Sequence, residues 1–261
     1  MLIDLTGRTA LISGASRGLG LAAATRFAES GADVALLARR PEVLEEARRS
    51  IQAKAPQRRI VAVSCDLTTP EDVATGYARA REALGPIDIL LNNVGGHSLG
   101  RFEDVSEAQW DHDLQIKLMC TVRLTRLCWP EMVRRRWGRV INTLNTLAKS
   151  PIAGSCPTAV TRAAQLALTK VLAEEGGPFN VLVNALLVGL IRSEQIDEIQ
   201  RQEGPGEKMA GFTAGRLARI PLGRIGEPDE FATIACFLAS DAASYITGSS
   251  IGVDGGMGRV I

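Results

Sequence analysis

The chain has 261 residues, of which 46% are hydrophobic and 23% charged, so it has ample apolar mass for a core and is not intrinsically disordered. Its 30 Lys and Arg nearly balance 29 Asp and Glu, which argues against a nucleic-acid-binding protein that relies on a basic surface. The five cysteines form no Cys-x-x-Cys or Cys/His metal spacing, which argues against a disulfide framework or a metal site.

The sequence shows no membrane-spanning segment. Its longest nearly apolar stretch, Val181 to Ile191, is too short to cross a bilayer. The first residues, MLIDLTGR, lack the long apolar region of a secretory signal. We therefore expect a soluble, cytoplasmic protein without a membrane partner.

Short runs rich in Val, Ile and Leu predict strands, and several are apolar throughout, as expected for strands covered on both faces. In chain order the predicted strands are Arg8 to Ser13, Asp33 to Ala38, Arg59 to Ser64, Ile87 to Asn92, Arg139 to Leu144, Asn180 to Ala185 and Ser250 to Val253.

Helical patterns fill the intervals between these runs. The predicted helices are Gly18 to Ser30, Pro41 to Ala55, Pro70 to Leu84, Ser106 to Arg136, Thr158 to Glu175 and Pro228 to Ser240. Alternation of this kind predicts an α/β fold, a Rossmann-like doubly wound parallel sheet flanked by helices on both faces. No repeat or linker divides the chain, so we expect a single domain over residues 1–261, with a substrate lid at 190–221.

A glycine-rich turn follows the first predicted strand and leads into the first predicted helix. Such a turn lets backbone amides and the helix N-terminus approach the diphosphate of a dinucleotide. A purely structural turn is the alternative, but the strand–turn–helix context favours the binding function. The segment is Ser13-Gly14-Ala15-Ser16-Arg17-Gly18-Leu19-Gly20.

The Gly-x3-Gly-x-Gly spacing resembles the short-chain dehydrogenase/reductase family, and later motifs agree with it in order. Asn92-Asn93-Val94-Gly95 is similar to the family's NNAG, and Val253-Asp254-Gly255-Gly256 matches its VDGG. Cys65-Asp66-Leu67 stands where the family places an Asp that accepts from adenine. Gly189, Ile191 and Ser193 resemble its PG-x-I-x-T segment, with Val188 in place of the proline.

The resemblance implies a nicotinamide cofactor. The second predicted strand ends in Ala38-Arg39-Arg40, without the carboxylate that would bind the ribose of NAD. Arg17 and Arg39 instead point to the 2′-phosphate of NADP, so we expect NADP in preference to NAD. The cofactor-binding residues so implied are Gly14, Ser16, Arg17, Gly18, Leu19, Gly20, Arg39, Asp66, Leu67, Asn93, Gly95, Arg162, Gly189, Ile191 and Ser193.

The catalytic positions depart from the family pattern, which uses Asn, Ser, Tyr and Lys. Neither tyrosine of the chain begins a Tyr-x3-Lys motif. By local alignment Thr158 replaces the Tyr and Arg162 the Lys, while Asn145 replaces the Ser and Lys117 the Asn. Because an aliphatic hydroxyl is a far weaker acid than a phenol, Thr158 cannot simply inherit the proton-donor role.

His97 and Lys117 are the main candidate replacement donors, and Lys149 is a second basic candidate beyond the fifth predicted strand. His97 follows the fourth predicted strand, and its pKa range suits proton transfer, although a polar loop residue is the alternative. Lys117 would reach the space that the missing lysine leaves, where a neighbouring cofactor would depress its pKa, although most lysines are simply solvated. Asn145 would orient the substrate oxygen and Arg162 would hold the cofactor.

These observations leave three functional hypotheses. The first is an NADP-dependent oxidoreductase for a small carbonyl or alcohol substrate, resembling 3-oxoacyl-(acyl carrier protein) reductases, with Lys117 or His97 as an atypical proton donor. The second is an NADP-binding regulatory or partner protein with weak or no turnover. The third is a non-redox enzyme on the same fold. The resemblance also implies a homo-oligomer, either a dimer or a tetramer.

Overall fold

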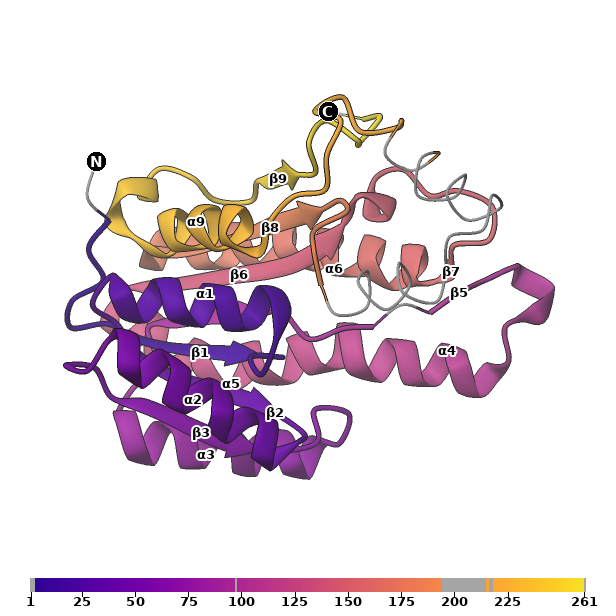
Figure 1. Ribbon diagram of the computed structural model, residues 1–261. Coiled ribbons are helices and arrows are strands. Elements are labelled where there is room, and N and C mark those ends of the chain that lie inside the picture. Colours follow the sequence, from indigo (N-terminus) through magenta and orange to yellow (C-terminus); the bar gives the residue numbers. More distant parts are fainter. Residues whose placement is uncertain (1–2, 97, 194–214, 216–217, 261) are drawn as a thin grey trace.

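The protein is described here by a computed structural model, which covers residues 3–96, 98–193, 215 and 218–260. Its strands are β1 (Thr9–Ser13), β2 (Asp33–Ala38), β3 (Ile60–Ser64), β4 (Ile89–Asn92), β5 (Leu99–Gly100), β6 (Gly138–Asn145), β7 (Cys156–Pro157), β8 (Val181–Val188) and β9 (Ser250–Val253). Seven of them form one parallel sheet in the order β3-β2-β1-β4-β6-β8-β9, while β5 and β7 pair antiparallel beside it (Figure 1).

Helices cover both faces of the main sheet. They are α1 (Gly18–Glu29), α2 (Pro41–Lys54), α3 (Pro70–Leu84), α4 (Glu107–Asp113), α5 (Cys120–Arg135), α6 (Thr158–Gly176) and α9 (Pro228–Ala239). The apolar sides of α1, α2 and α9 pack on one face, and those of α3, α5 and α6 on the other (Figure 1). The predicted single-domain Rossmann-like fold, with helices on both faces of a parallel sheet, is thereby confirmed.

Small residues set the spacing of α1 and α9, which lie side by side over the sheet (Figure 1). Phe27 of α1 and Phe231 of α9 are fully buried in the shared core. Alanines surround them on both helices and allow the two backbones to approach closely; they are Ala23, Ala24, Ala28, Ala232, Ala235 and Ala239. This packing anchors α1, whose N-terminus borders the glycine-rich turn.

The strand order reverses beside β1, and this reversal determines where a ligand can enter. β1 pairs with β2 on one side and with β4 on the other. The connections that leave these strands diverge to opposite faces, so a crevice opens at the carboxyl ends of β1 and β4. The glycine-rich turn follows β1 and Asn93 follows β4, so both lie at this edge of the sheet.

The structure differs from the sequence prediction in two elements that matter for the site. Strand β8 continues to Val188, three residues beyond the predicted end, because β6 and β9 both pair with its last residues. The long helix predicted over 106–136 is interrupted by a π-helical segment, Leu114–Met119, which contains Lys117.

Most of the predicted lid at 190–221 lies outside the described residues, as does His97. In the part of the chain that is described, no helix has both the length and the apolar character needed to cross a membrane.

Candidate active site

The glycine-rich turn is shaped by backbone conformations and contacts that favour glycine. Gly14, after β1, has φ +65°, and Gly18, at the start of α1, has φ +53°. Residues with a side chain are strained in this left-handed region, whereas glycine adopts it readily. The amide of Gly14 donates to the carbonyl of Leu37 at 2.9 Å. A Cβ at Gly20 would lie 2.7 Å from Nδ2 of Asn93, so glycine lets α1 pack onto the turn.

A single hydroxyl joins the loops that follow β1 and β4. Oγ of Ser13 accepts from the amide of Asn93 at 2.9 Å and from the amide of Val94 at 3.2 Å. The side chain of Asn93 donates back to the carbonyl of Gly14 at 3.3 Å. These bonds fix the two walls of the crevice relative to each other before any ligand binds.

A cavity of about 780 Å³ extends along this crevice, a volume typical of small-ligand sites. The sequence-predicted residues that line it are Gly14, Ser16, Arg17, Leu19, Arg39, Leu67, Asn93, Gly95, Asn145, Arg162, Gly189, Ile191 and Ser193. Gly18, Gly20 and Asp66 are adjacent in sequence to lining residues but do not line the cavity themselves. Lys117 and Thr158 lie behind its wall, both 1% exposed.

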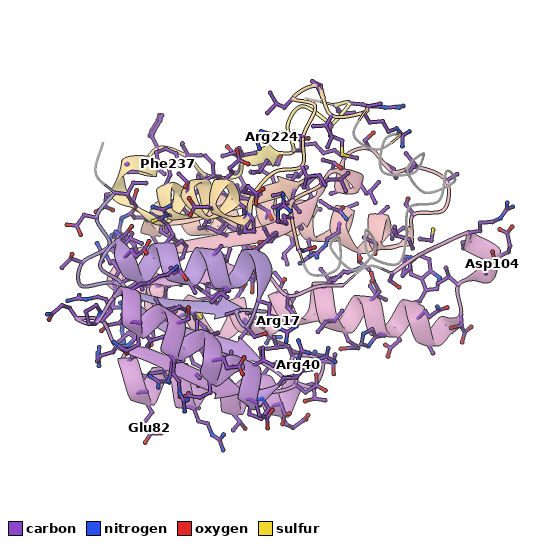
Figure 2. All side chains as sticks on the ribbon, in the orientation of Figure 1. Arg17, Arg40, Glu82, Asp104, Arg224 and Phe237 are labelled. Carbon is purple, nitrogen blue, oxygen red and sulfur yellow. The ribbon has the colours of Figure 1, made fainter. Side chains whose placement is uncertain are left out.

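Three arginines border one end of the cavity. Arg17 comes from the glycine-rich turn, and Arg39 and Arg40 follow β2; Figure 2 labels Arg17 and Arg40. Oγ of Ser64 donates to the carbonyl of Arg39 at 2.9 Å, which fixes the backbone there. Guanidinium groups pair with phosphate in bidentate geometry, so this end is suited to a phosphate ester. Arg40 was not among the cofactor-binding residues predicted from the sequence.

Asp66 has a local partner. Its Oδ1 accepts from the amide of Thr68 at 2.9 Å and from the Thr68 hydroxyl at 2.8 Å. These hydrogen bonds stabilise the carboxylate and lower the pKa of Asp66. The turn that they form presents Leu67 to the cavity next to Arg39.

The segment that begins at Gly189 packs against the loop of the Val253-Asp254-Gly255-Gly256 motif. The amide of Gly189 donates to the carbonyl of Val253 at 3.1 Å. A Cβ at Gly189 would lie 2.7 Å from Cβ of Asp254, so glycine is needed for this approach. The carboxylate of Asp254 in turn accepts from the amides of Gly256 and Gly258 at 2.9 and 2.8 Å. Asp254 therefore organises its own loop, against which the segment starting at Gly189 rests.

At the other end of the site, four buried polar side chains form one hydrogen-bonded cluster behind the cavity wall. The Lys117 ammonium forms an ion pair with Oδ1 of Asp113 and donates to Oγ1 of Thr158 at 2.6 Å. The Thr161 hydroxyl donates to Oδ2 of Asp113 at 2.6 Å, and the Thr158 hydroxyl donates to the carbonyl of Ser98 at 2.8 Å. Asp113 and Ser98 line the cavity, so the cluster meets it at two points.

The interrupted helix accounts for the position of Lys117. The carbonyl of Lys117 accepts from the Thr121 hydroxyl at 2.9 Å and from Nε2 of Gln165 at 3.0 Å. These side chains satisfy a backbone group within a π-helical segment, a feature that often occurs at functional sites. Burial lowers the pKa of Lys117 to about 8, and Asp113 opposes that shift while the charge of Arg162 adds to it.

Arg162 is held along one edge and unpartnered along the other. Its Nη1 donates to the carbonyl of Thr143 at 2.9 Å and to Oε1 of Gln165 at 2.6 Å. Its Nε is buried and has no hydrogen-bond partner among the described residues, and the same holds for Oδ1 of Asn145. Burial lowers the pKa of Arg162 to about 10, which leaves the guanidinium charged at neutral pH.

Asp113, Thr161 and Gln165, which hold Lys117 and Arg162 in place, were not predicted from the sequence. Asp113 stands four residues before Lys117, the spacing of an ion pair on a helix, so this signal was available in the sequence. Gln165 and Thr161 lie on α6 and meet the segment around Lys117 only where the two helices pack. Among the described residues, no three His, Cys, Asp or Glu side chains are close enough to hold a metal ion.

Comparisons with known proteins agree with this architecture. A family profile described as enoyl-(acyl carrier protein) reductase matches residues 14–258. Oxidoreductase UcpA of Escherichia coli K12 is 37% identical over 254 residues, which are 97% of this chain and 95% of that protein.

Two solved structures cover nearly the whole chain. L-sorbose reductase from Gluconobacter frateurii, in complex with NADPH and L-sorbose, has a TM-score of 0.94 and 33% identity, with 100% of both chains covered. An NADPH-bound short-chain oxidoreductase from Pseudomonas aeruginosa PAO1, described as containing an atypical catalytic center, has a TM-score of 0.91 and 32% identity, with 99% of both chains covered. The profile match and these similarities establish that the chain belongs to the short-chain dehydrogenase/reductase family of oxidoreductases.

Proposed function

We propose that the chain is an NADP-dependent reductase that interconverts a carbonyl compound and an alcohol, with Lys117 as its proton source. The observation that carries this proposal is the two-ended cavity. One end combines the glycine-rich turn with arginines, and the other carries Arg162 and Asn145, which have buried polar atoms without partners among the described residues. A buried polar atom without a partner is costly, so these atoms suit a ligand that supplies the missing hydrogen bonds.

The residues present fit NADP. Backbone amides of the glycine-rich turn would meet the diphosphate, and Arg17 and Arg39 would bind the 2′-phosphate. The Nε and Nη2 edge of Arg162 would donate to hydroxyls of the nicotinamide ribose, because Nη1 is already engaged. Asp66 would accept from the adenine amino group. NADPH in the Gluconobacter and Pseudomonas structures supports NADP here as well.

The protein's own groups would orient the substrate and supply one proton. When bound, the reduced nicotinamide supplies a hydride to the carbonyl carbon. The amide of Asn145 would donate to the carbonyl oxygen and stabilise its developing negative charge. As the C=O π bond breaks, that oxygen takes a proton from the Thr158 hydroxyl, which is replenished by the Lys117 ammonium 2.6 Å away. Lys117 ends as a neutral amine, the form that burial favours, and regains a proton from solvent between turnovers.

This route requires the Thr158 hydroxyl to turn from the Ser98 carbonyl toward the substrate. Rotation about its C–O bond would redirect the proton, and Ser98, which lines the cavity and covers Thr158, would have to move aside for the substrate to reach the hydroxyl. The arrangement replaces a phenol with a weak acid that is backed by a cation. The atypical catalytic center named for the Pseudomonas structure supports departure from the usual residues within this fold.

A second candidate function is an NADP-binding protein without turnover. It is favoured by the burial of Lys117 and Thr158, which are each 1% exposed and bonded to each other. Under this alternative the cluster only fills the space behind the cavity wall. A lid at 190–221 and a homo-oligomeric assembly remain predictions under either function.

One experiment in two stages tests the proposed function. Titration of the protein with NADPH and NADH, followed by nucleotide fluorescence, is expected to show tighter binding of NADPH. A panel of ketones, aldehydes and keto sugars is then screened for loss of NADPH absorbance. Turnover of any of them supports the reductase, NADPH binding without turnover supports the second function, and no binding of either nucleotide contradicts both.

A further inference from the structure

The carboxylate of Asp113 lies between the two helices that carry the candidate catalytic groups. It closes α4 at the start of the π-helical segment, and it is 1% exposed. One oxygen pairs with the Lys117 ammonium and the other accepts from the Thr161 hydroxyl of α6 at 2.6 Å. Because both oxygens are bonded, the carboxylate has one orientation, and the ammonium must follow it.

Lys117 and Arg162 place two cations close together beneath Gly95. A side chain at Gly95 would overlap Nη2 of Arg162 and come within 4.0 Å of Cε of Lys117. Both cations are buried, so each is costly unless an anion compensates its charge. Among the described residues, Asp113 is the carboxylate that pairs with this group, and Thr158 is the other partner of the ammonium.

We propose that Asp113 is a positioning residue for proton transfer, whose fixed carboxylate keeps the Lys117 ammonium charged and directed at the Thr158 hydroxyl. This inference rests on the proposed reductase function and adds a residue to it. Asp113 does not touch the reacting atoms in this role. It acts by holding the donor in its charged form and by setting the direction in which its proton leaves.

Two charged groups act on Lys117 in the described part of the chain. Asp113 on α4 raises its pKa, and Arg162 on α6 lowers it. Replacement of Asp113 by Asn would remove the attraction between the carboxylate and the Lys117 ammonium and leave the repulsion between Arg162 and Lys117. A neighbouring opposite charge typically changes a pKa by about 1–3 units. The protonated donor would then be lost at a correspondingly lower pH.

The test compares pH profiles of kcat/KM for carbonyl reduction by the wild type and by Asp113→Asn. The wild type is expected to lose activity as pH rises through about 8. This loss of activity at high pH is the alkaline limb of the profile. In Asp113→Asn the alkaline limb is expected about 1–3 pH units lower, while the Kd for NADPH changes less than twofold. Asp113→Glu, which restores the charge, is expected to return the limb toward pH 8. A merely structural role would lower kcat without moving the limb.

Asp111→Asn is the matched control, because Asp111 is an exposed carboxylate on the same helix. It is expected to leave the limb in place. Should Asp113→Asn fail to fold, as judged by circular dichroism and NADPH binding, Asp113→Ser takes its place, since it leaves room for a water molecule. A limb that stays at the wild-type pH in the neutral variant overturns the proposal for Asp113, even where reductase activity and the role of Lys117 hold.

A readout without turnover separates this inference from the proposed function. The pKa of Lys117 is measured by NMR on protein labelled with ε-¹³C-lysine, and Lys117→Met identifies the resonance. A lower Lys117 pKa in Asp113→Asn supports the electrostatic role, and an unchanged pKa contradicts it. Failure of every carbonyl substrate, by contrast, would count against the proposed function alone.

Discussion

Nη2 of Arg162 occupies the space that a side chain at Gly95 would need. The guanidinium is pinned from the far side by the Thr143 carbonyl and by Gln165, so it cannot retreat without breaking both hydrogen bonds. A glycine after β4 and an arginine on α6 thus fit together as one unit in the cavity wall. The pairing explains how the cavity wall accommodates the bulky guanidinium group of Arg162.

We therefore expect Gly95→Ala to displace Arg162 and weaken NADPH binding. Overpacking of this kind typically costs about 1–3 kcal/mol of stability, which a urea unfolding curve would reveal. Gly177→Ala is the control, because a methyl group there would meet nothing within 4 Å. NADPH binding by Gly95→Ala as tight as that of the wild type would show that Arg162 does not contact the cofactor.

The arginines at the other end of the cavity predict cofactor preference. A hydrogen bond to a charged group contributes about 1.5–3 kcal/mol, so Arg17→Ala and Arg39→Ala should each weaken NADPH binding about 10- to 100-fold. NADH lacks the 2′-phosphate, and its affinity should change little. Arg49→Ala, an exposed arginine of α2, is the control. Equal losses for both nucleotides would contradict recognition of the 2′-phosphate.

The buried pair of Lys117 and Asp113 predicts a non-additive effect on stability. Lys117→Met leaves Asp113 buried without its cation, and breaking one side of such a pair typically costs about 3–5 kcal/mol. Lys117→Met combined with Asp113→Leu removes both charges and should recover most of that loss. The free energy of unfolding of the two single variants and the double variant, measured with urea, checks this cycle. Additive losses would mean that the two charges do not stabilise each other.

The lowered pKa of Lys117 predicts opposite pH dependences for the two reaction directions. Reduction needs the ammonium, so kcat/KM should be constant below about pH 8 and fall above it. Oxidation of the alcohol needs the neutral amine and should rise through the same pH. An arginine stays protonated throughout this range, so Lys117→Arg should lack both limbs if it retains activity. If the pH profiles of Lys117→Arg were the same as those of the wild type, the change in activity near pH 8 would belong to another group.

The fold was predictable because each strand of the main sheet carries its own local signal. β1 and β2, for example, each contain an unbroken apolar run, Ala10 to Ile12 and Val34 to Ala38, as burial on both faces favours. Strands β5 and β7 were missed because each has two residues and exists only through pairing across a long stretch of chain. The break in the long helix was missed because Leu114–Met119 has an ordinary helical composition, and its carbonyl at Lys117 is satisfied by Gln165 from another helix.

The cofactor half of the site was more predictable than the catalytic half, because its main motif is contiguous in the sequence. The glycine-rich turn is contiguous, so its residues meet the cavity together. The cluster around Lys117 is assembled from three separate segments, and only the spacing of Asp113 and Lys117 leaves a mark in the sequence. No sequence motif predicts the role of Thr161 or Gln165, since that role depends on how α6 packs against the interrupted helix.

The role of Lys117 as the proton source is tested most directly by single-turnover reduction with bound NADPH in Lys117→Met, using a carbonyl substrate that the wild type accepts. Loss of a positioned proton donor lowers the chemical rate about 10²- to 10⁴-fold. We expect a decrease of this size with the NADPH Kd within twofold of the wild-type value. A Lys117→Met enzyme that oxidises NADPH at the wild-type rate would contradict Lys117 as the proton source.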